Sequence, residues 1–279
     1  MLEFVIRGLL NGSVYALLAV PMSLLFATAA TVDFAIGAYA LLAAAVASTV
    51  AGTLGLAAGL AAAFVASAAM ALVFAGLRRK GADHLVISLA SFGVSVALSS
   101  IVLIVWGTNP FAKPTGAAIL EVAGIRINSQ SILNAAISIT LIFMLYLLLL
   151  RTQLGRMMRA AATNPMGAEL CGIPVLWVQC ATILVGGILG GCAGLFILLG
   201  AGLDYSASLG LTLLGFTAAI LFGIQNPVRS LYGGLAMGVI EAVAAGYTSG
   251  LLTLLLPSLF MLLVLVCSQR GLGLTGLRP

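Results

Sequence analysis

The sequence predicts an all-α, polytopic transmembrane bundle with eight or nine spans, and three observations support this fold class. Hydrophobic residues fill 62% of the 279 positions. Charged residues fill only 7%, against roughly a quarter in soluble domains. The apolar residues form repeated runs of about 20, the length of a membrane-crossing helix, whereas a barrel requires short alternating strands. We therefore expect one transmembrane domain over residues 1–279.

The apolar runs, taken in order, locate the expected spans. They lie at residues 6–27, 34–51, 54–77, 86–106, 131–150, 177–199, 209–224, 231–247 and 251–268. The run at 209–224 is short for a crossing and is expected to be tilted, broken or re-entrant, which leaves the count between eight and nine.

Several expected spans carry glycines at a spacing of four residues. These are Gly55 and Gly59, then Gly186, Gly190 and Gly194, then Gly234 and Gly238. Small residues at this spacing line one face of a helix and let a neighbouring backbone approach closely. Tight packing accounts for the pattern, and no pore-lining role is needed.

The basic residues orient the spans across the membrane. Cytoplasmic loops are enriched in Lys and Arg. If residues 151–175 are cytoplasmic, alternation also places residues 78–85, 225–230 and the C-terminus inside. Nine of the 12 basic residues then lie inside; they are Arg78, Arg79, Lys80, Arg151, Arg156, Arg159, Arg229, Arg270 and Arg278. Arg7, Lys113 and Arg126 remain outside. Cytoplasmic loops explain the net charge of +5 better than a nucleic-acid partner, although contact with membrane lipid is expected.

Two connections are long enough to meet a partner. Residues 107–130, with a polar–apolar alternation toward Gln130, are expected outside the cell, as a partner site or a plain connector. Residues 151–175 form the one long polar interruption, basic and rich in Ala and Gly. Its length suits one or two short helices. We expect it to be the docking site for a cytoplasmic partner, while lipid binding by its arginines is the alternative.

Two acidic residues fall at or within spans. Glu241 lies about ten residues into its span, near mid-depth at 1.5 Å per residue. A carboxyl group there is costly unless paired or protonated, so it is either functional or hydrogen-bonded to a neighbouring helix. Asp33 stands at a span boundary, where we expect it to cap the helix that begins near Phe34.

Absent motifs exclude other functions. The sequence has no Walker-type Gly-x-x-x-x-Gly-Lys-Ser/Thr, so we expect no nucleotide hydrolysis and no cofactor on this chain. No zinc-protease or serine-hydrolase motif occurs, which disfavours an enzyme. The four cysteines, Cys171, Cys180, Cys192 and Cys267, show no paired spacing, and no metal site is expected. A stand-alone ion-coupled transporter or channel remains the alternative, with Glu241 as its ionisable group.

Five stretches resemble the permease subunits of bacterial ABC importers for branched-chain amino acids, a family that includes urea and amide permeases. The five stretches occur in the same order as in that family and extend over nearly the whole chain. They are residues 8–19, 32–37, 89–110, 223–242 and 268–273. The resemblance implies half of a translocation pathway for a small amino acid, amide or urea-like solute in the cell inner membrane. It also implies two ATPase subunits that use ATP, a second related permease subunit and an extracytoplasmic solute-binding protein.

The resemblance also assigns residues. The cytoplasmic loop of that family docks into the ATPase, which implies contacts from Gly155, Arg156, Arg159, Ala160, Ala161, Ala162, Gly167 and Gly172. Candidates for the translocation path are Asn11, Ser13, Tyr15, Asp33 and Glu241. Two departures are present: Asp33 and Ile36 stand where the family usually has Asn and His, and Thr163 and Asn164 stand where acidic residues are common.

Overall fold

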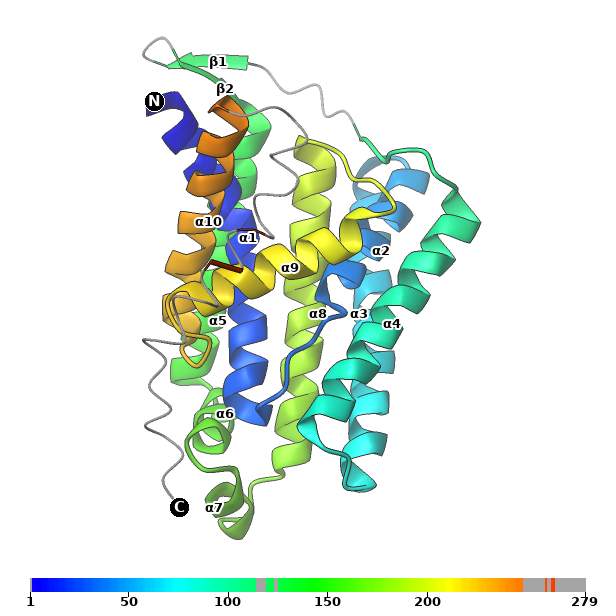
Figure 1. The fold of residues 1–279 in the computed structure, drawn as a ribbon, viewed down its shortest axis with the longest axis vertical. Coiled ribbons are helices and arrows are strands. Elements are labelled where there is room, and N and C mark those ends of the chain that lie inside the picture. The colour runs from blue at the N-terminus through cyan, green and yellow to red at the C-terminus, as the bar shows by residue number, and fades with distance from the viewer. Residues whose placement is uncertain (1, 114–118, 123–124, 248–258, 260–261, 264–279) are drawn as a thin grey trace.

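The computed structural model describes residues 2–113, 119–122, 125–247, 259 and 262–263. Apart from one short hairpin, its regular elements are helices (Figure 1). In chain order they are α1 (Leu2–Ala29), α2 (Ile36–Thr49), α3 (Gly52–Arg79), α4 (His84–Trp106), β1 (Ile119–Val122), β2 (Ile125–Asn128), α5 (Ser129–Arg151), α6 (Gln153–Thr163), α7 (Pro165–Leu170), α8 (Val175–Gly200), α9 (Ala207–Leu221) and α10 (Pro227–Tyr247).

Within the described residues, six helices are long and apolar enough to cross a membrane: α1, α3, α4, α5, α8 and α10. Two further apolar helices, α2 and α9, are shorter. Each expected span up to residue 247 coincides with one of these eight helices. The expected span at 251–268 lies almost entirely outside the described residues. The chain is therefore a multi-pass helical membrane protein.

Helix α1 lies inside the bundle, and its most extensive partner is α10. It also packs against α8, α9 and α5, while α2, α3 and α8 form a second contact group. Figure 1 shows α9 crossing the bundle obliquely, whereas α3, α5 and α8 run along its long axis. The short run at 209–224 thus forms one unbroken helix, α9, that is inclined to the long axis of the bundle.

Glycines permit the closest helix contacts, as their spacing predicted. A Cβ atom at Gly238 of α10 would overlap the backbone of Gly12 on α1, and a Cβ at Gly234 would lie 2.6 Å from the Cα of Ala16. On α8, a Cβ at Gly194 would overlap the carbonyl group of Ala40 on α2. Larger side chains at these positions would force the backbones apart.

The two ends of the bundle differ. The α3–α4 turn, α6 and α7 lie at one end, here called the basic end because it carries Arg78, Arg79, Lys80 and the arginines of residues 151–175 (Figure 1). The start of α1 and the antiparallel pair β1–β2 lie at the other end, here called the hairpin end. The prediction that 78–85 and 151–175 share an end, opposite the described part of 107–130, is confirmed. The strands themselves were not predicted.

The loop after α4 is fastened to two other parts of the hairpin end. Phe111 and Leu203 exchange backbone hydrogen bonds of 2.7 and 2.9 Å, which attaches the loop to the α8–α9 connection. The Lys113 ammonium donates three hydrogen bonds of 2.8–3.1 Å to carbonyl oxygens at the α2–α3 turn, those of Ala47, Val50 and Gly52. This loop therefore links the ends of α2 and α8 that lie at the hairpin end.

Candidate functional site

The chain between α1 and α2 is unwound inside the bundle. Figure 1 shows it leaving the lower end of α1 and rising without helical turns to the start of α2. Unpaired backbone groups are costly in a membrane protein, and hydroxyl groups from α4 satisfy two of them. The Val32 N–H donates to Ser88 Oγ at 3.3 Å, and the Phe34 N–H donates to Ser91 Oγ at 2.9 Å. Residues 30–35 are thus a supported break in a span.

Asp33 lies within this break and is only 4% exposed. Its Oδ1 accepts a hydrogen bond from the Ala35 N–H at 2.9 Å, and its Oδ2 accepts one from the Tyr39 hydroxyl at 3.2 Å. The prediction that Asp33 caps the next helix is wrong, because α2 begins at Ile36 and its N-cap, Ala35, has no side-chain cap. Asp33 instead closes a local turn and fixes the first helical turn of α2 through Tyr39.

Helix α9 closes the other side of the break through Thr212. Its Oγ1 accepts a hydrogen bond from the Gly37 N–H at 3.1 Å and lies 3.2 Å from the carbonyl oxygen of Phe34. A Cβ atom at Gly37 would overlap the Ser208 carbonyl and the Thr212 side chain. A glycine at this position therefore lets α9 reach the broken backbone. Broken spans of this kind line binding sites in many transporters.

An outer cavity of about 510 Å³ opens at the hairpin end between α1, α5 and α8. Arg7, Asn11 and Tyr15 follow one another every fourth residue on α1 and all line it. Asn134 of α5 also lines this cavity. Its Oδ1 accepts a hydrogen bond from Gln130 Nε2, and its Nδ2 donates one to the Phe196 carbonyl oxygen. A row of polar residues on a spanning helix is stable where it faces water rather than lipid.

Glu241 lies on α10 beside this cavity. Its carboxyl group lies next to the Tyr15 hydroxyl of α1, a neighbouring helix. The second oxygen, Oε2, is buried and has no hydrogen-bond partner among the described residues. Ser13 behaves differently: it is buried, its hydroxyl donates to the Leu10 carbonyl at 2.7 Å, and it lines neither cavity.

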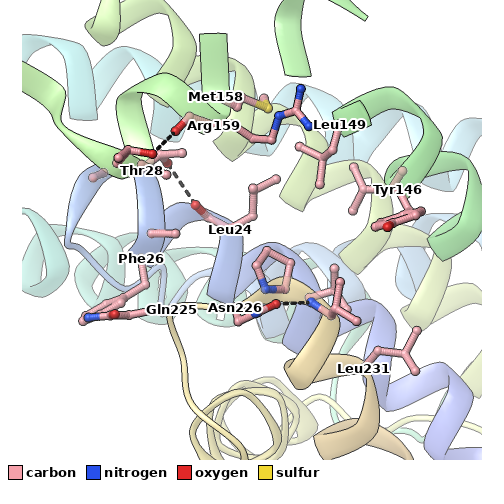
Figure 2. Close-up of a pocket in the computed structure, with 18 of the residues that line it drawn as sticks. Leu24, Phe26, Thr28, Tyr146, Leu149, Met158, Arg159, Gln225, Asn226 and Leu231 are labelled. Carbon is pink, nitrogen blue, oxygen red and sulfur yellow. Dashed lines mark hydrogen bonds between the residues drawn. The ribbon is translucent and has the colours of Figure 1, made fainter. Parts of the chain in front are cut away.

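An inner cavity of about 1050 Å³ opens toward the basic end between α1, α5, α6 and the start of α10 (Figure 2). Its wall is mostly aliphatic, with Leu24, Leu149 and Leu231 from three different helices. Polar residues also line it, among them Arg159 of α6 and Asn226 before α10. The cavity combines an apolar body with a cationic rim, which suits a small amphiphilic solute.

Helix α1 contributes to both cavities, and its middle separates them. It lines the outer cavity as far as Tyr15 and the inner cavity from Val20 onward. The four residues between, Ala16, Leu17, Leu18 and Ala19, are at most 1% exposed. The described structure therefore has an opening at each end and a dense apolar layer between them.

Helices α6 and α7 form the expected pair of short helices outside the bundle. Thr152 caps α6 by accepting a hydrogen bond from Gly155 N–H, and Asn164 caps α7 by accepting one from Gly167 N–H. After α7, Gly172 adopts φ +80°, and the Ile173 N–H bonds the Ala168 carbonyl. This left-handed ending suits glycine and turns the chain back into α8.

The residues expected to dock the ATPase divide by exposure. Ala161 is fully buried, and a Cβ atom at Gly155 would overlap the last carbonyls of α5, so both pack within this chain. Ala160 and Gly167 are half-buried. The exposed members are Arg156, Arg159, Ala162 and Gly172. These exposed residues are accessible to a partner, while the buried Gly155 and Ala161 position the helices.

Sequence reasoning missed an apolar pair on α7. Met166 is 74% exposed and Leu170 is 83% exposed. They are four residues apart, so they share one face of the helix. The sequence signal for this surface was an apolar pair, four residues apart, inside an otherwise polar segment. It also missed the hydroxyl residues of α4, Ser88 and Ser91, which are three apart in a span and support the break.

Among the described residues, no side chains are grouped as a metal site or a disulfide would require. No three His, Cys, Asp or Glu side chains lie together there as a metal site requires. Cys171, Cys180 and Cys192 are unpaired, and Cys267 lies outside the described residues.

Comparisons with known proteins agree with this architecture. A family model for the permease component of the branched-chain amino acid transport system matches residues 4–267. The high-affinity branched-chain amino acid permease BraD of Pseudomonas aeruginosa is 26% identical over 302 residues, covering 100% of this chain and 96% of that protein. LivH of Escherichia coli K12 is 25% identical over 295 residues, covering 97% and 94%. The nucleoside permease NupC of Lactococcus lactis is 28% identical over 120 residues, covering 42% and 37%. The chain therefore belongs to the family of permease components of branched-chain amino acid transport systems.

Proposed function

We propose that this chain is the membrane-spanning permease subunit of an ATP-driven importer for branched-chain or other small amino acids, forming half of the translocation pathway. The full-length match to this permease family carries the proposal. The two branched-chain amino acid permeases above match along almost their whole length, whereas the nucleoside permease matches less than half of the chain. The two cavities separated by a buried layer on α1 suit alternating access.

The chemical work of the importer falls to other subunits. The family is a permease component and is not itself catalytic. In our proposal ATP is bound and hydrolysed by two separate ATPase subunits, and this chain binds no cofactor. A second related permease completes the pathway, and an extracytoplasmic binding protein delivers the solute. The ion-coupled alternative gains one group, since Asp33 is a second buried acid. Both oxygens of Asp33, however, accept hydrogen bonds that hold the break.

We propose that the basic end is cytoplasmic and that the chain crosses nine times. Figure 1 shows α1, α3 and α5 running from the hairpin end toward the basic end, whereas α4 and α8 run in the opposite direction. The break with α2, then α9 and α10, supply three more crossings, and the expected span at 251–268 supplies the ninth. The N-terminus then lies outside and the C-terminus inside, as the positive charge of the basic end favours.

Cysteine labelling in a cysteine-free background tests the orientation. Asn109→Cys at the hairpin end and Thr163→Cys at the basic end are both at exposed positions. An impermeant maleimide should label Asn109→Cys in intact cells and Thr163→Cys only after permeabilisation. The reverse pattern would overturn the orientation.

The proposed ATPase-docking surface is the exposed side of α6 and α7, defined by Arg156, Met166 and Leu170. Small and buried residues hold these helices close to the bundle, and the exposed apolar pair provides area that a partner can bury. Arg156 can form a charged hydrogen bond with an acidic residue on the rim of the partner.

Met166→Asp and Leu170→Asp test this docking surface without disturbing buried residues. Each variant should insert normally but lose the ATPase during purification from membranes, together with binding-protein-dependent uptake. Asn109→Asp, an exposed change at the opposite end, is the control and should keep both. Retention of the ATPase and of wild-type uptake by both α7 variants would refute the proposed docking surface.

A further inference from the structure

Helix α6 presents two different accessible sides. Its buried residues, Met158 and Ala161, face the bundle. Arg156 and Arg159 are both exposed, but only Arg159 lines the inner cavity, together with Ala162 and Thr163. Figure 2 shows the Arg159 side chain reaching over the cavity toward Leu149 of α5. The two arginines, which the sequence alone treated as equivalent, therefore have different surroundings.

Three polar residues of the inner cavity, Thr28, Thr163 and Asn226, are engaged in local backbone contacts. The Thr28 hydroxyl donates to the Leu24 carbonyl at 2.9 Å, and the Thr163 hydroxyl donates to the Arg159 carbonyl at 2.9 Å. Asn226 Oδ1 accepts a hydrogen bond from the Val228 N–H at 3.0 Å. Figure 2 draws these three bonds on the cavity wall.

The cations of the cavity have no acid opposite them. Arg159 and Arg78 line it, and no Asp or Glu is among its lining residues. The described residues show no ion pair to the Arg159 guanidinium. A guanidinium beside an apolar wall attracts a carboxylate, which it can hold through two parallel hydrogen bonds.

We propose that the inner cavity receives the solute on its way to the cytoplasm and that Arg159 binds the solute's carboxylate. The aliphatic side chain of the solute then lies against Leu24, Leu149 and Leu231. This inference rests on the proposed function and assigns a substrate class to it: small aliphatic α-amino acids, selected by a free carboxylate at one end and a branched hydrocarbon at the other. Arg156 remains on the docking surface.

This placement connects ATPase contact with solute release. Helix α6 packs against the ends of α1, α5 and α8 and also supplies one wall of the inner cavity. A displacement of α6 by a docked ATPase would move Arg159 relative to the α5 wall. The same small movement would change the mouth of the cavity and the position of its cation.

A cysteine-protection experiment tests the assignment directly. Ala162→Cys places a thiol at an exposed position that lines the cavity, in a chain whose native cysteines are replaced by Ser. The full importer complex is studied in inside-out membrane vesicles. L-Leucine should slow maleimide labelling of this thiol, whereas leucinol, which lacks the carboxylate, should not.

Two matched arginine variants decide the role of Arg159. Arg159→Gln should raise the leucine concentration needed for half-protection by about tenfold or more, the size expected from losing one charge-assisted hydrogen bond. Arg156→Gln should leave protection unchanged and weaken co-purification of the ATPase. Arg159→Lys, which keeps the charge but not the fork, should fall between Arg159→Gln and the parent.

Three results would overturn the inference: protection that is equal in Arg159→Gln and the parent, protection that is lost equally in Arg156→Gln, or no protection by leucine. A cavity that is protected by added phosphatidylglycerol but not by leucine would be a lipid site, which also refutes the assignment. Binding-protein-dependent uptake by the unmodified complex is measured in parallel. If that uptake is present while protection fails, only this inference fails; if ATP-dependent uptake is absent, the proposed function fails.

Discussion

The broken span before α2 offers a sharp test of its own, through Tyr39→Phe. This change removes one hydroxyl group and leaves the ring of a fully buried residue in place. The hydroxyl is the hydrogen-bond donor for Asp33 Oδ2, at 3.2 Å. Without it, that oxygen loses its hydrogen-bond donor in a region shielded from water. Leaving a buried polar atom unsatisfied costs about 1–3 kcal/mol, and we expect Tyr39→Phe to lower stability by that amount.

Thermal unfolding of the purified protein in detergent, followed by loss of monodisperse protein, measures the effect. Tyr232→Phe is the matched control, because Tyr232 is exposed on α10. A double-mutant cycle with Asp33→Asn should show a coupling of about 0.5–3 kcal/mol between the two side chains. If Tyr39→Phe and Tyr232→Phe unfold at the same temperature, the hydrogen bond does not hold the break, and the reasoning fails.

Three other outcomes are expected. Lys113→Met should lower thermal stability more than Lys80→Met, since Lys113 donates three hydrogen bonds whereas Lys80 is exposed at the basic end; equal midpoints would contradict this. Gly238→Val should destabilise the bundle by about 1–3 kcal/mol through overpacking, while Gly210→Val, with open space around it, should have little effect on the same assay. Glu241→Gln should keep much of the solute uptake, because an amide can lie next to the Tyr15 hydroxyl as the carboxyl group does, and complete loss with normal assembly would restore an ionisable role.

The spans could be predicted from the sequence because the bilayer demands long apolar helices with internally satisfied backbones. Hydropathy placed every described span within a few residues, and glycine spacing identified helix faces that do pack closely. The basic residues also identified which loops share an end. These features depend on composition and local periodicity, which a single sequence displays directly.

The break at residues 30–35 could not be predicted in the same way. Its backbone groups find partners on Ser88, Ser91 and Thr212, which are 56 to 178 positions away in sequence. A hydroxyl inside an apolar span usually bonds its own helix, so its long-range role is invisible until the fold is known.

Residues 151–175 show a second limit of prediction from the sequence. The two arginines of α6 differ by three positions on one helix, yet only the packing of α6 against α5 decides which of them reaches the inner cavity. Likewise Ala161 fitted the expected pattern of small docking residues but is covered by its own chain. Sequence patterns identify a helix and its composition, whereas the direction of each face depends on the neighbours.

The fastening of the loop after α4 has a mechanical consequence. Lys113 joins that loop to the α2–α3 turn, and the Phe111–Leu203 pair joins it to the α8–α9 connection. These elements are therefore linked at the hairpin end as one block, while the glycine contacts join α1 and α10 as a second block. The outer cavity lies along the seam between them, with α1 on one side and the end of α8 on the other. A small rotation of one block against the other, about the buried apolar layer of α1, would therefore widen the outer cavity.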